Sequence, residues 1–249
     1  MRVSLVCPSS RLRSARRASL ALGALACLAA APSLAAQSVS PPIAEYQERA
    51  RSSFQLINSG IFPLNVVLEV RGFSVTERGE VQDATLDISK VHVKLSAMSF
   101  RIPPRGTYTV FYEATADSLP AWFNILSAMT GARTESGLNV RILLPHVVYL
   151  NQKEALRKEQ VAIRKLELDS AAGKLRVQLE NLGPNLGRVQ QVTATAGKAT
   201  SPPSAGFPLF PHMIRWTEVD WPGSLSPERL TIRFAKFSVD TLLSPLSSP

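Results

Sequence analysis

Cysteine is nearly absent from this sequence of 249 residues, and both copies lie near its start. Cys7 and Cys27 are the only two, so the chain after residue 36 contains none. This absence excludes a disulfide framework or a thiolate metal site in that part of the protein. Its stability must come from packed hydrophobic cores, and the chain is long enough for one large domain or two smaller ones.

Histidine is scarce as well, and the motifs of catalysis are missing. His92, His146 and His212 are the three histidines, and their separations do not match a metal-ligand spacing. The sequence contains neither a Gly-x-Ser-x-Gly nucleophile turn nor a Gly-rich phosphate loop. We therefore predict a protein that is not an enzyme and that holds no cofactor and no metal; an exported enzyme is the less supported alternative.

The first 36 residues have the composition of a secretory signal peptide. Five arginines and no acidic residue precede an apolar run from Ala18 to Ala31, which Pro32 ends. The run is shorter than the roughly 20 apolar residues of a membrane span. We predict cleavage after Ala35 or Ala36 and export of the remaining chain from the cytoplasm.

The charge of the exported chain is unremarkable once the signal peptide is removed. Taking the five arginines of residues 1–36 from the formal net charge of +9 leaves +4. Such a modest charge does not indicate a nucleic-acid partner.

Helical periodicity is nearly absent after residue 36, and short strand-like runs replace it. These runs are bounded by Gly, Pro, Asn and Asp, a pattern typical of a β-sandwich or barrel. Residues 77–83 and 198–206 are predicted as loops. The predicted strands are residues 53–58, 64–70, 92–95, 99–102, 107–112, 138–149, 161–168, 174–180, 189–195, 213–216 and 230–239.

A charged segment with little apolar content, residues 152–160, divides these strands into two similar groups. We predict an all-β fold of two immunoglobulin-like β-sandwich domains, residues 37–152 and 153–249, behind a signal peptide of residues 1–36. The last residues are predicted to be a disordered tail. A single large barrel is the alternative.

Several segments resemble the PapD-like periplasmic chaperones of pilus and fimbrial assembly. The resemblance covers residues 38–150, and it reaches the second half only through Asn181 and the strand pattern. The segments are the strand that ends at Asn58, residues 100–106, the Leu-Pro turn and aromatic strand of residues 119–125, and the long strand of residues 138–144. The resemblance implies a chaperone for a pilin-like or other secreted β-rich subunit, with an outer-membrane usher and a self-capped dimer as further possibilities.

In that family the long strand is lent to a subunit that lacks its own last strand. The corresponding row here is formed by the alternating side chains Leu138, Val140, Ile142 and Leu144. An added strand satisfies the backbone groups of an incomplete sandwich, while alternate side chains fill its apolar groove. The same four residues could instead line the core of their own domain, or some could do both.

The family also binds the terminal carboxylate of the subunit with an Arg and a Lys. The resemblance places Ile43 at the first of these positions and His146 or Val147 at the second. We therefore consider His146, Arg141 and Arg51 as possible carboxylate anchors, since charged or hydrogen-bonding groups are needed for that task.

Two functions are consistent with these features. The first is a periplasmic chaperone that binds incomplete immunoglobulin-like subunits by strand donation and delivers them for outer-membrane assembly. The second is an exported structural or adhesive module that binds a surface ligand. The strand of residues 138–144 should lie at a free sheet edge in the first case and be paired on both sides in the second.

Overall fold

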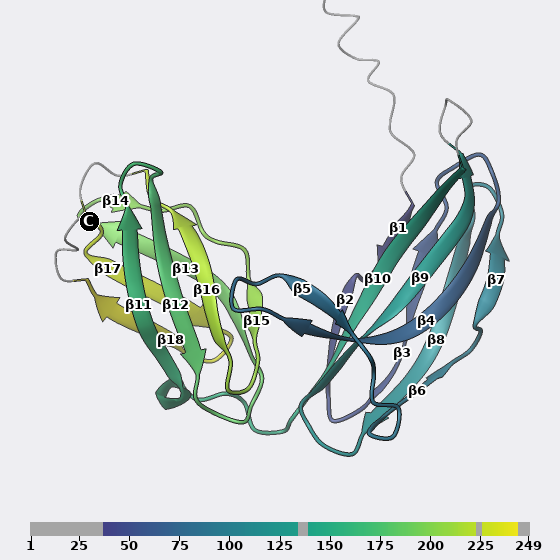
Figure 1. Ribbon diagram of the computed structural model, residues 1–249, viewed down its shortest axis with the longest axis horizontal. Helices are drawn as coiled ribbons and strands as arrows, with labels where there is room; N and C mark the ends of the chain where they lie inside the picture. The colour runs from purple at the N-terminus through teal and green to yellow at the C-terminus, as the bar shows by residue number, and fades with distance from the viewer. Residues whose placement is uncertain (1–36, 134–138, 223–225, 244–249) are drawn as a thin grey trace, which may run out of the picture. The chain divides into compact units, whose positions relative to one another are not determined.

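The computed structural model describes residues 37–133, 139–222 and 226–243, all of which belong to one compact unit, Gln37–Pro249. The predicted signal peptide and C-terminal tail lie outside the described residues. Within these ranges the regular elements are strands, apart from the one-turn 3-10 helix η1 (Lys158–Gln160) (Figure 1). The predicted all-β fold class is confirmed.

The first ten strands form two sheets around one core, which we call the N-terminal sandwich. Its first sheet has the order β1-β3-β8-β6, with β1 (Ser38–Ser40), β3 (Ala50–Ile57), β8 (Thr107–Ala116) and β6 (Val91–Leu95). Its second sheet has the order β2-β10-β9-β4-β5, and β7 also pairs with β4. These strands are β2 (Ile43–Gln47), β10 (Asn139–Asn151), β9 (Ala121–Arg133), β4 (Leu64–Val75), β5 (Val81–Ala84) and β7 (Ser99–Ile102).

The remaining strands form the C-terminal sandwich, again two sheets around one core. One sheet has the order β11-β12-β16, with β11 (Val161–Asp169), β12 (Lys174–Asn181) and β16 (Ile214–Asp220). The other has the order β14-β13-β17-β18, and β15 also pairs with β13. These strands are β13 (Gly187–Ala196), β14 (Ala199–Thr200), β15 (Phe207–Leu209), β17 (Arg229–Phe234) and β18 (Ser238–Leu242). The predicted boundary after Gln152 falls between the two sandwiches, and their independence as domains stays a prediction.

Alternation of apolar and polar side chains explains why these segments become strands. In β3, Phe54 and Leu56 are buried while Gln55 between them is exposed. Strand side chains point to opposite faces in turn, so one face of each strand enters the core. Each fully buried side chain of this size contributes about 1.5–3 kcal/mol.

A buried asparagine ends one strand in each sandwich and ties down the loop that follows. The Asn58 side chain donates to the carbonyls of Phe62 and Pro103 at 2.8 and 2.9 Å and accepts from the Gly60 N–H at 3.0 Å. Asn181 does the same in the C-terminal sandwich: it donates to Asn185 O and Leu209 O and accepts from Gly183 N–H, at distances of 2.7, 3.2 and 2.9 Å. A buried amide with these partners fixes irregular backbone that has no sheet to satisfy it.

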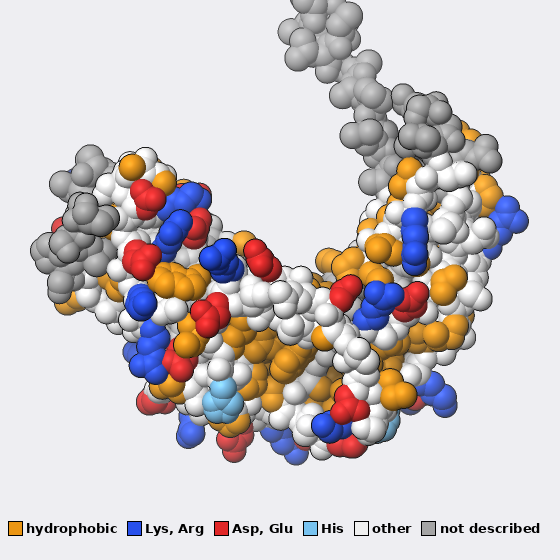
Figure 2. Space-filling view, viewed as in Figure 1, with side chains coloured by type: hydrophobic (Ala, Val, Ile, Leu, Met, Phe, Trp, Pro, Cys, Tyr) orange, Lys and Arg blue, Asp and Glu red, His pale blue; other side chains and the backbone are white. Residues whose placement is uncertain are grey.

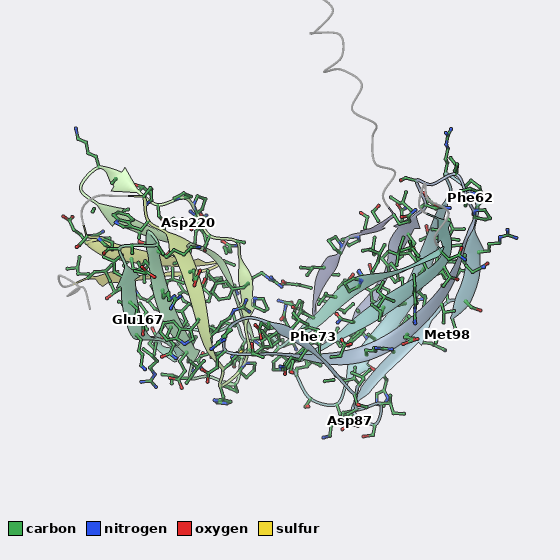
Figure 3. All side chains as sticks on the ribbon, turned by 45° about the horizontal axis from the view of Figure 1, so that its top comes forward. Phe62, Phe73, Asp87, Met98, Glu167 and Asp220 are labelled. Atoms are coloured by element: carbon green, nitrogen blue, oxygen red, sulfur yellow. The ribbon has the colours of Figure 1, made fainter. Side chains whose placement is uncertain are left out.

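A third buried cluster contains residues from both sandwiches. Phe73 of β4 and Tyr149 of β10 lie in it with Leu186 and Phe210 (Phe73 is labelled in Figure 3). Trp122 packs against it and donates its indole N–H to the Phe73 carbonyl at 2.9 Å. The aromatic residues of the apolar segment 206–211 are therefore buried rather than exposed.

Two expectations about strand limits are corrected. Residues 230–239 form two strands, because the chain reverses between Phe234 and Phe237, whose N–H and C=O bond at 2.9 Å. Residues 77–83 are not wholly a loop, since β4 continues to Val75 and β5 begins at Val81. The first turn contains no glycine, proline, asparagine or aspartate, so the sequence pattern did not reveal it, whereas the second contains Gly79 with φ of +85° and is shorter than the predicted loop.

Candidate functional site

The site begins with the pairing of β10, which differs along its length. On one side β9 pairs with β10 from Asn139 to Leu150. On the other side β2 pairs only with residues 147–151, and nothing among the described residues pairs there with residues 139–146. The first half of β10 therefore presents unpaired backbone N–H and C=O groups at a sheet edge, a template for another strand. We call this stretch the free edge.

The free edge carries the predicted apolar row. Ile142 and Leu144 are half-buried and pack against the core of the N-terminal sandwich, and Val140 is 37% exposed. Leu138 lies outside the described residues. Ile142 and Leu144 therefore contact the core of their own domain and remain accessible at its border, and donation of the row to another protein stays a prediction.

A β-bulge in β9 shapes the start of this edge. The register moves from Val140 opposite Ala132 to Ile142 opposite Met129, so β9 has one more residue than β10 in this interval. Gly131 lies there with φ of +98°, and a Cβ on it would stand 2.9 Å from the Pro63 carbonyl oxygen. A glycine is needed because the backbone conformation and the close approach both exclude a side chain.

Apolar side chains also face solvent on the outer surface of the same sheet. Leu143 of β10 and Val67 of β4 are 50% and 49% exposed, with Ala128 of β9 between them in register. Met98, 57% exposed, precedes β7 and accepts the N–H of Leu68 (Figure 3). Figure 2 shows hydrophobic side chains on the face over β10, β9 and β4.

The three candidate anchors do not come together. Arg141 is exposed on β10, on the outer face beside Leu143. Arg51 lies on the other sheet, with its side chain 87% exposed and paired with Glu113 at 3.2 Å. His146 has no exposed surface and lies within the core.

The structure brings together residues that the sequence resemblance compares with a carboxylate clamp, namely Ile43 and either His146 or Val147. Ile43 of β2 lies directly opposite Val147 of β10, and the Val147 N–H donates to the Pro42 carbonyl at 2.9 Å. Both side chains are apolar, so this position offers no cation to a carboxylate.

His146 occupies the point where the free edge ends and β2 begins. Its Nδ1 lies 2.7 Å from the Pro41 carbonyl oxygen and its Nε2 lies 3.0 Å from the Tyr112 hydroxyl. The Tyr112 hydroxyl in turn lies 2.9 Å from that of Tyr46 in β2, and the imidazole stacks on Phe54 with ring centroids 4.4 Å apart. We call the hydrogen-bonded chain of Pro41 O, His146, Tyr112 and Tyr46 the His146 latch.

The Pro41 carbonyl at one end of the latch determines which group donates in each of its hydrogen bonds. A carbonyl only accepts, so His146 Nδ1 carries the proton, and in the neutral ring Nε2 accepts from Tyr112. Tyr112 is then free to accept from Tyr46. Burial lowers the pKa of His146, opposed in part by the bond to Pro41, while burial and the Tyr46 hydroxyl raise the pKa of Tyr112. The latch is therefore a neutral network at ordinary pH.

Sequence reasoning considered His146 as an exposed anchor and did not identify Tyr46, Tyr112 or Pro41. A signal for burial was present: His146 continues the alternation of Ile142 and Leu144 toward the core residue Val148. The partners could not be found this way, because they come from strands far away in the chain.

The described residues contain no group of three His, Cys, Asp or Glu side chains placed to hold a metal. Within the same residues, no helix has the length and hydrophobicity needed to cross a membrane.

Comparison with known proteins identifies the fold. No protein-family model and no curated protein matches the sequence. A chain in the structure of the Salmonella enterica SafA pilin in complex with the SafB chaperone matches with a TM-score of 0.50 and 14% identity, over 86% of this chain and 99% of that chain. The class 5 fimbriae chaperone CfaA matches with a TM-score of 0.49 and 9% identity, over 85% and 100% of the two chains. The complex of CsuC and CsuE from Acinetobacter baumannii contains a chain that matches with a TM-score of 0.46 and 13% identity, over 83% and 98%. The likeness to the chain of the SafA–SafB complex, together with the two-sheet sandwiches, shows that this chain has an immunoglobulin-like, all-β fold.

Proposed function

We propose that this protein is a periplasmic chaperone that binds an incomplete immunoglobulin-like pilus or surface subunit by adding β10 to it, and that it delivers the subunit for assembly at the outer membrane. The observation that carries the proposal is the free edge of residues 139–146 with its accessible apolar row. The fold shared with the chain of the SafA–SafB complex supports it. An outer-membrane usher and a self-capped dimer stay predictions.

The chemistry of the edge suits this task. A subunit that lacks a strand exposes apolar surface and unpaired backbone groups, and β10 can supply both kinds of partner. Each added backbone hydrogen bond contributes about 0.5–1.5 kcal/mol net. Ile142 and Leu144 are already partly buried, so each contributes less than the about 1.5–3 kcal/mol of a fully exposed side chain. Ordering the two partners opposes these gains.

The test is capture of a subunit from the native periplasm by the tagged mature protein, followed by identification of the bound proteins. We expect a small β-rich secreted subunit to be captured by the wild type and lost with Ile142→Asp. Phe111→Asp is the control, since Phe111 is 61% exposed on the other sheet. Capture of the same subunit by all three proteins would contradict the proposal.

Because Ile142 packs against the core, its substitution could unfold the protein. Val140→Asp is the second variant, since Val140 is accessible on the same edge. Circular dichroism and thermal melting establish that each variant is folded. If the Val140→Asp protein is folded and does not capture the subunit, binding by the free edge is supported. If the Val140→Asp protein captures the subunit and the Ile142→Asp protein is unfolded, binding by the free edge loses its support.

The alternative, a structural or adhesive module, has one observation in its favour. An open groove lies along β15 and β16, lined by Phe207, Trp216 and Arg215 among others. Aromatic and guanidinium groups together suit a polar surface ligand. If no subunit is captured and folded Ile142→Asp behaves as the wild type does, this module becomes the better description.

A further inference from the structure

The outer edge of β10 has two parts, and only one is free. β2 pairs in parallel with residues 147–151, from Ile43 opposite Val147 to Gln47 opposite Asn151. Residues 139–146 lie next to this stretch on the same edge. A subunit strand added to β10 would therefore lie in line with β2 and end where β2 begins.

Besides its pairing with β10, the strand β2 has few side-chain contacts: Tyr46 packs against the core, and Glu45 is paired with Arg188 of β13. It has five residues, β10 is its one partner strand among the described residues, and its side chains alternate between exposed and half-buried. Ile43, Glu45 and Gln47 face solvent, and none of the five residues is fully buried. Elements with little buried surface open at a low free-energy cost, before the rest of the domain unfolds.

The His146 latch compensates for this weak packing. Its two ends, the Pro41 carbonyl and the Tyr46 hydroxyl, both belong to the segment that contains β2, and its centre is buried between the sheets. One network thus joins the start of β2 and its fourth residue to the core. Pro41 and Pro42 lack an N–H, so their carbonyls, bonded to His146 and Val147, are the backbone groups that fix the start of β2.

We propose that β2 is a displaceable strap on the subunit-binding edge, that the His146 latch holds it in place, and that its release extends this edge by residues 147–151. The inference rests on the proposed function, and it predicts how far the subunit's strand extends along β10. That strand continues past His146 and competes with Ile43–Gln47 for the same backbone groups of β10. The His146 latch positions the strap and does not contact the subunit.

Hydrogen exchange in the isolated protein tests whether the strap opens by itself. We expect the amides of β2 to exchange at least about 100-fold faster than those of β9, which is paired on both sides. Tyr112→Phe keeps the ring and removes the hydroxyl that joins His146 to Tyr46, so it should accelerate exchange in β2 by about tenfold. Tyr108→Phe is the control on the same strand, because that ring stacks on Phe100 outside the latch. Exchange of β2 and β9 in one cooperative step in the wild type would overturn the proposal.

A disulfide lock tests displacement directly. Ile43→Cys with Val147→Cys places two cysteines in register, in a chain that has no other cysteine after residue 36. The probe is a labelled synthetic peptide that copies residues 41–48. We expect the reduced protein to bind the peptide in place of β2 and the oxidised protein not to bind it. Equal binding to both forms, or to neither, would overturn the strap. Ser38→Cys with Ile57→Cys, which locks β1 to β3, is the control and should leave binding unchanged.

The captured subunit then connects the strap to the function. We expect it to dissociate about tenfold faster from the oxidised Ile43→Cys, Val147→Cys protein than from the reduced one. If both forms hold the subunit equally well, the strap is wrong while the proposed function stands. If the wild type captures no subunit but the peptide still exchanges with β2, the proposed function fails and the strap loses its role in it.

Discussion

The two sandwiches of this protein are built alike and differ at their edges. Both end a strand in a buried asparagine that ties the next loop, Asn58 in one and Asn181 in the other. Both have long edge strands. The free edge of β10 carries Val140, Ile142, Leu143 and Leu144 with one charge, Arg141. The edge strand β11 carries Arg164, Lys165 and Glu167 in its exposed positions.

This difference bears on the proposal that β10 pairs with a subunit. Charged side chains on an edge strand oppose the addition of another strand, and soluble proteins use them for that purpose. β11 has three exposed charges, whereas the free edge of β10 has one charge, Arg141, and one proline, Pro145, among its apolar side chains. The two edges belong to sandwiches of the same kind in one chain, so a difference between them is not required by the fold, and it supports the proposed function.

The largest effects should come from the two buried asparagines. Asn58→Ala and Asn181→Ala each remove at least three hydrogen bonds between a buried amide and the backbone, so we expect losses of about 2–4 kcal/mol in the free energy of unfolding. Calorimetry can separate the sandwiches. If they are independent domains, each variant lowers one thermal transition and leaves the other in place; a single transition lowered by both would show one cooperative unit.

Making the edge strand β11 as apolar as the free edge of β10 tests whether its charges prevent pairing. Lys165→Ile with Glu167→Val makes the exposed positions of β11 apolar, as on β10. We expect self-association to rise several-fold at equal concentration, because an unprotected edge becomes available. Light scattering measures this, with Lys198→Ile as the control at an exposed position outside β11. Unchanged scattering would mean that edge charge does not protect β11.

Sequence patterns predicted most of the fold because the strands alternate regularly. The row at Ile142 and Leu144 and the strand end at Asn58 were both visible in this way. The pairing of β10 was not, since β2 is a short strand with a weak apolar pattern, and its partner lies about a hundred residues further along the chain. The same holds for His146, whose role depends on Tyr46, Tyr112 and Pro41 from other strands.

Acid should weaken the N-terminal sandwich through His146. Its pKa is lowered in the folded state, so the unfolded chain binds the proton more readily, and stability is complete above the ordinary value of about 6.5 and falls as the pH drops below it. For this one group, the free energy of unfolding can change by at most about 1.4 kcal/mol per pH unit. Unfolding of the wild type and of His146→Asn between pH 5 and 8 measures it. An equal pH dependence in both proteins would assign the effect to groups other than His146.

The smallest effects should come from the exposed arginines. Arg51 is paired with Glu113 in solvent and Arg141 is exposed on β10, and exposed ion pairs contribute about 0–1 kcal/mol. Of the residues that the resemblance compares with the clamp, Ile43 and Val147 are apolar and paired with each other. The alternative, His146, is buried and hydrogen-bonded within the latch, so a terminal carboxylate finds no exposed cation there. We expect Arg51→Ala and Arg141→Ala to capture the subunit as the wild type does. Capture should also persist in 0.5 M salt, where charges more than about 5 Å apart are largely screened from each other. If either variant loses capture and capture by the wild type is sensitive to salt, that arginine is the carboxylate anchor. The free edge would then bind the subunit together with a charged side chain.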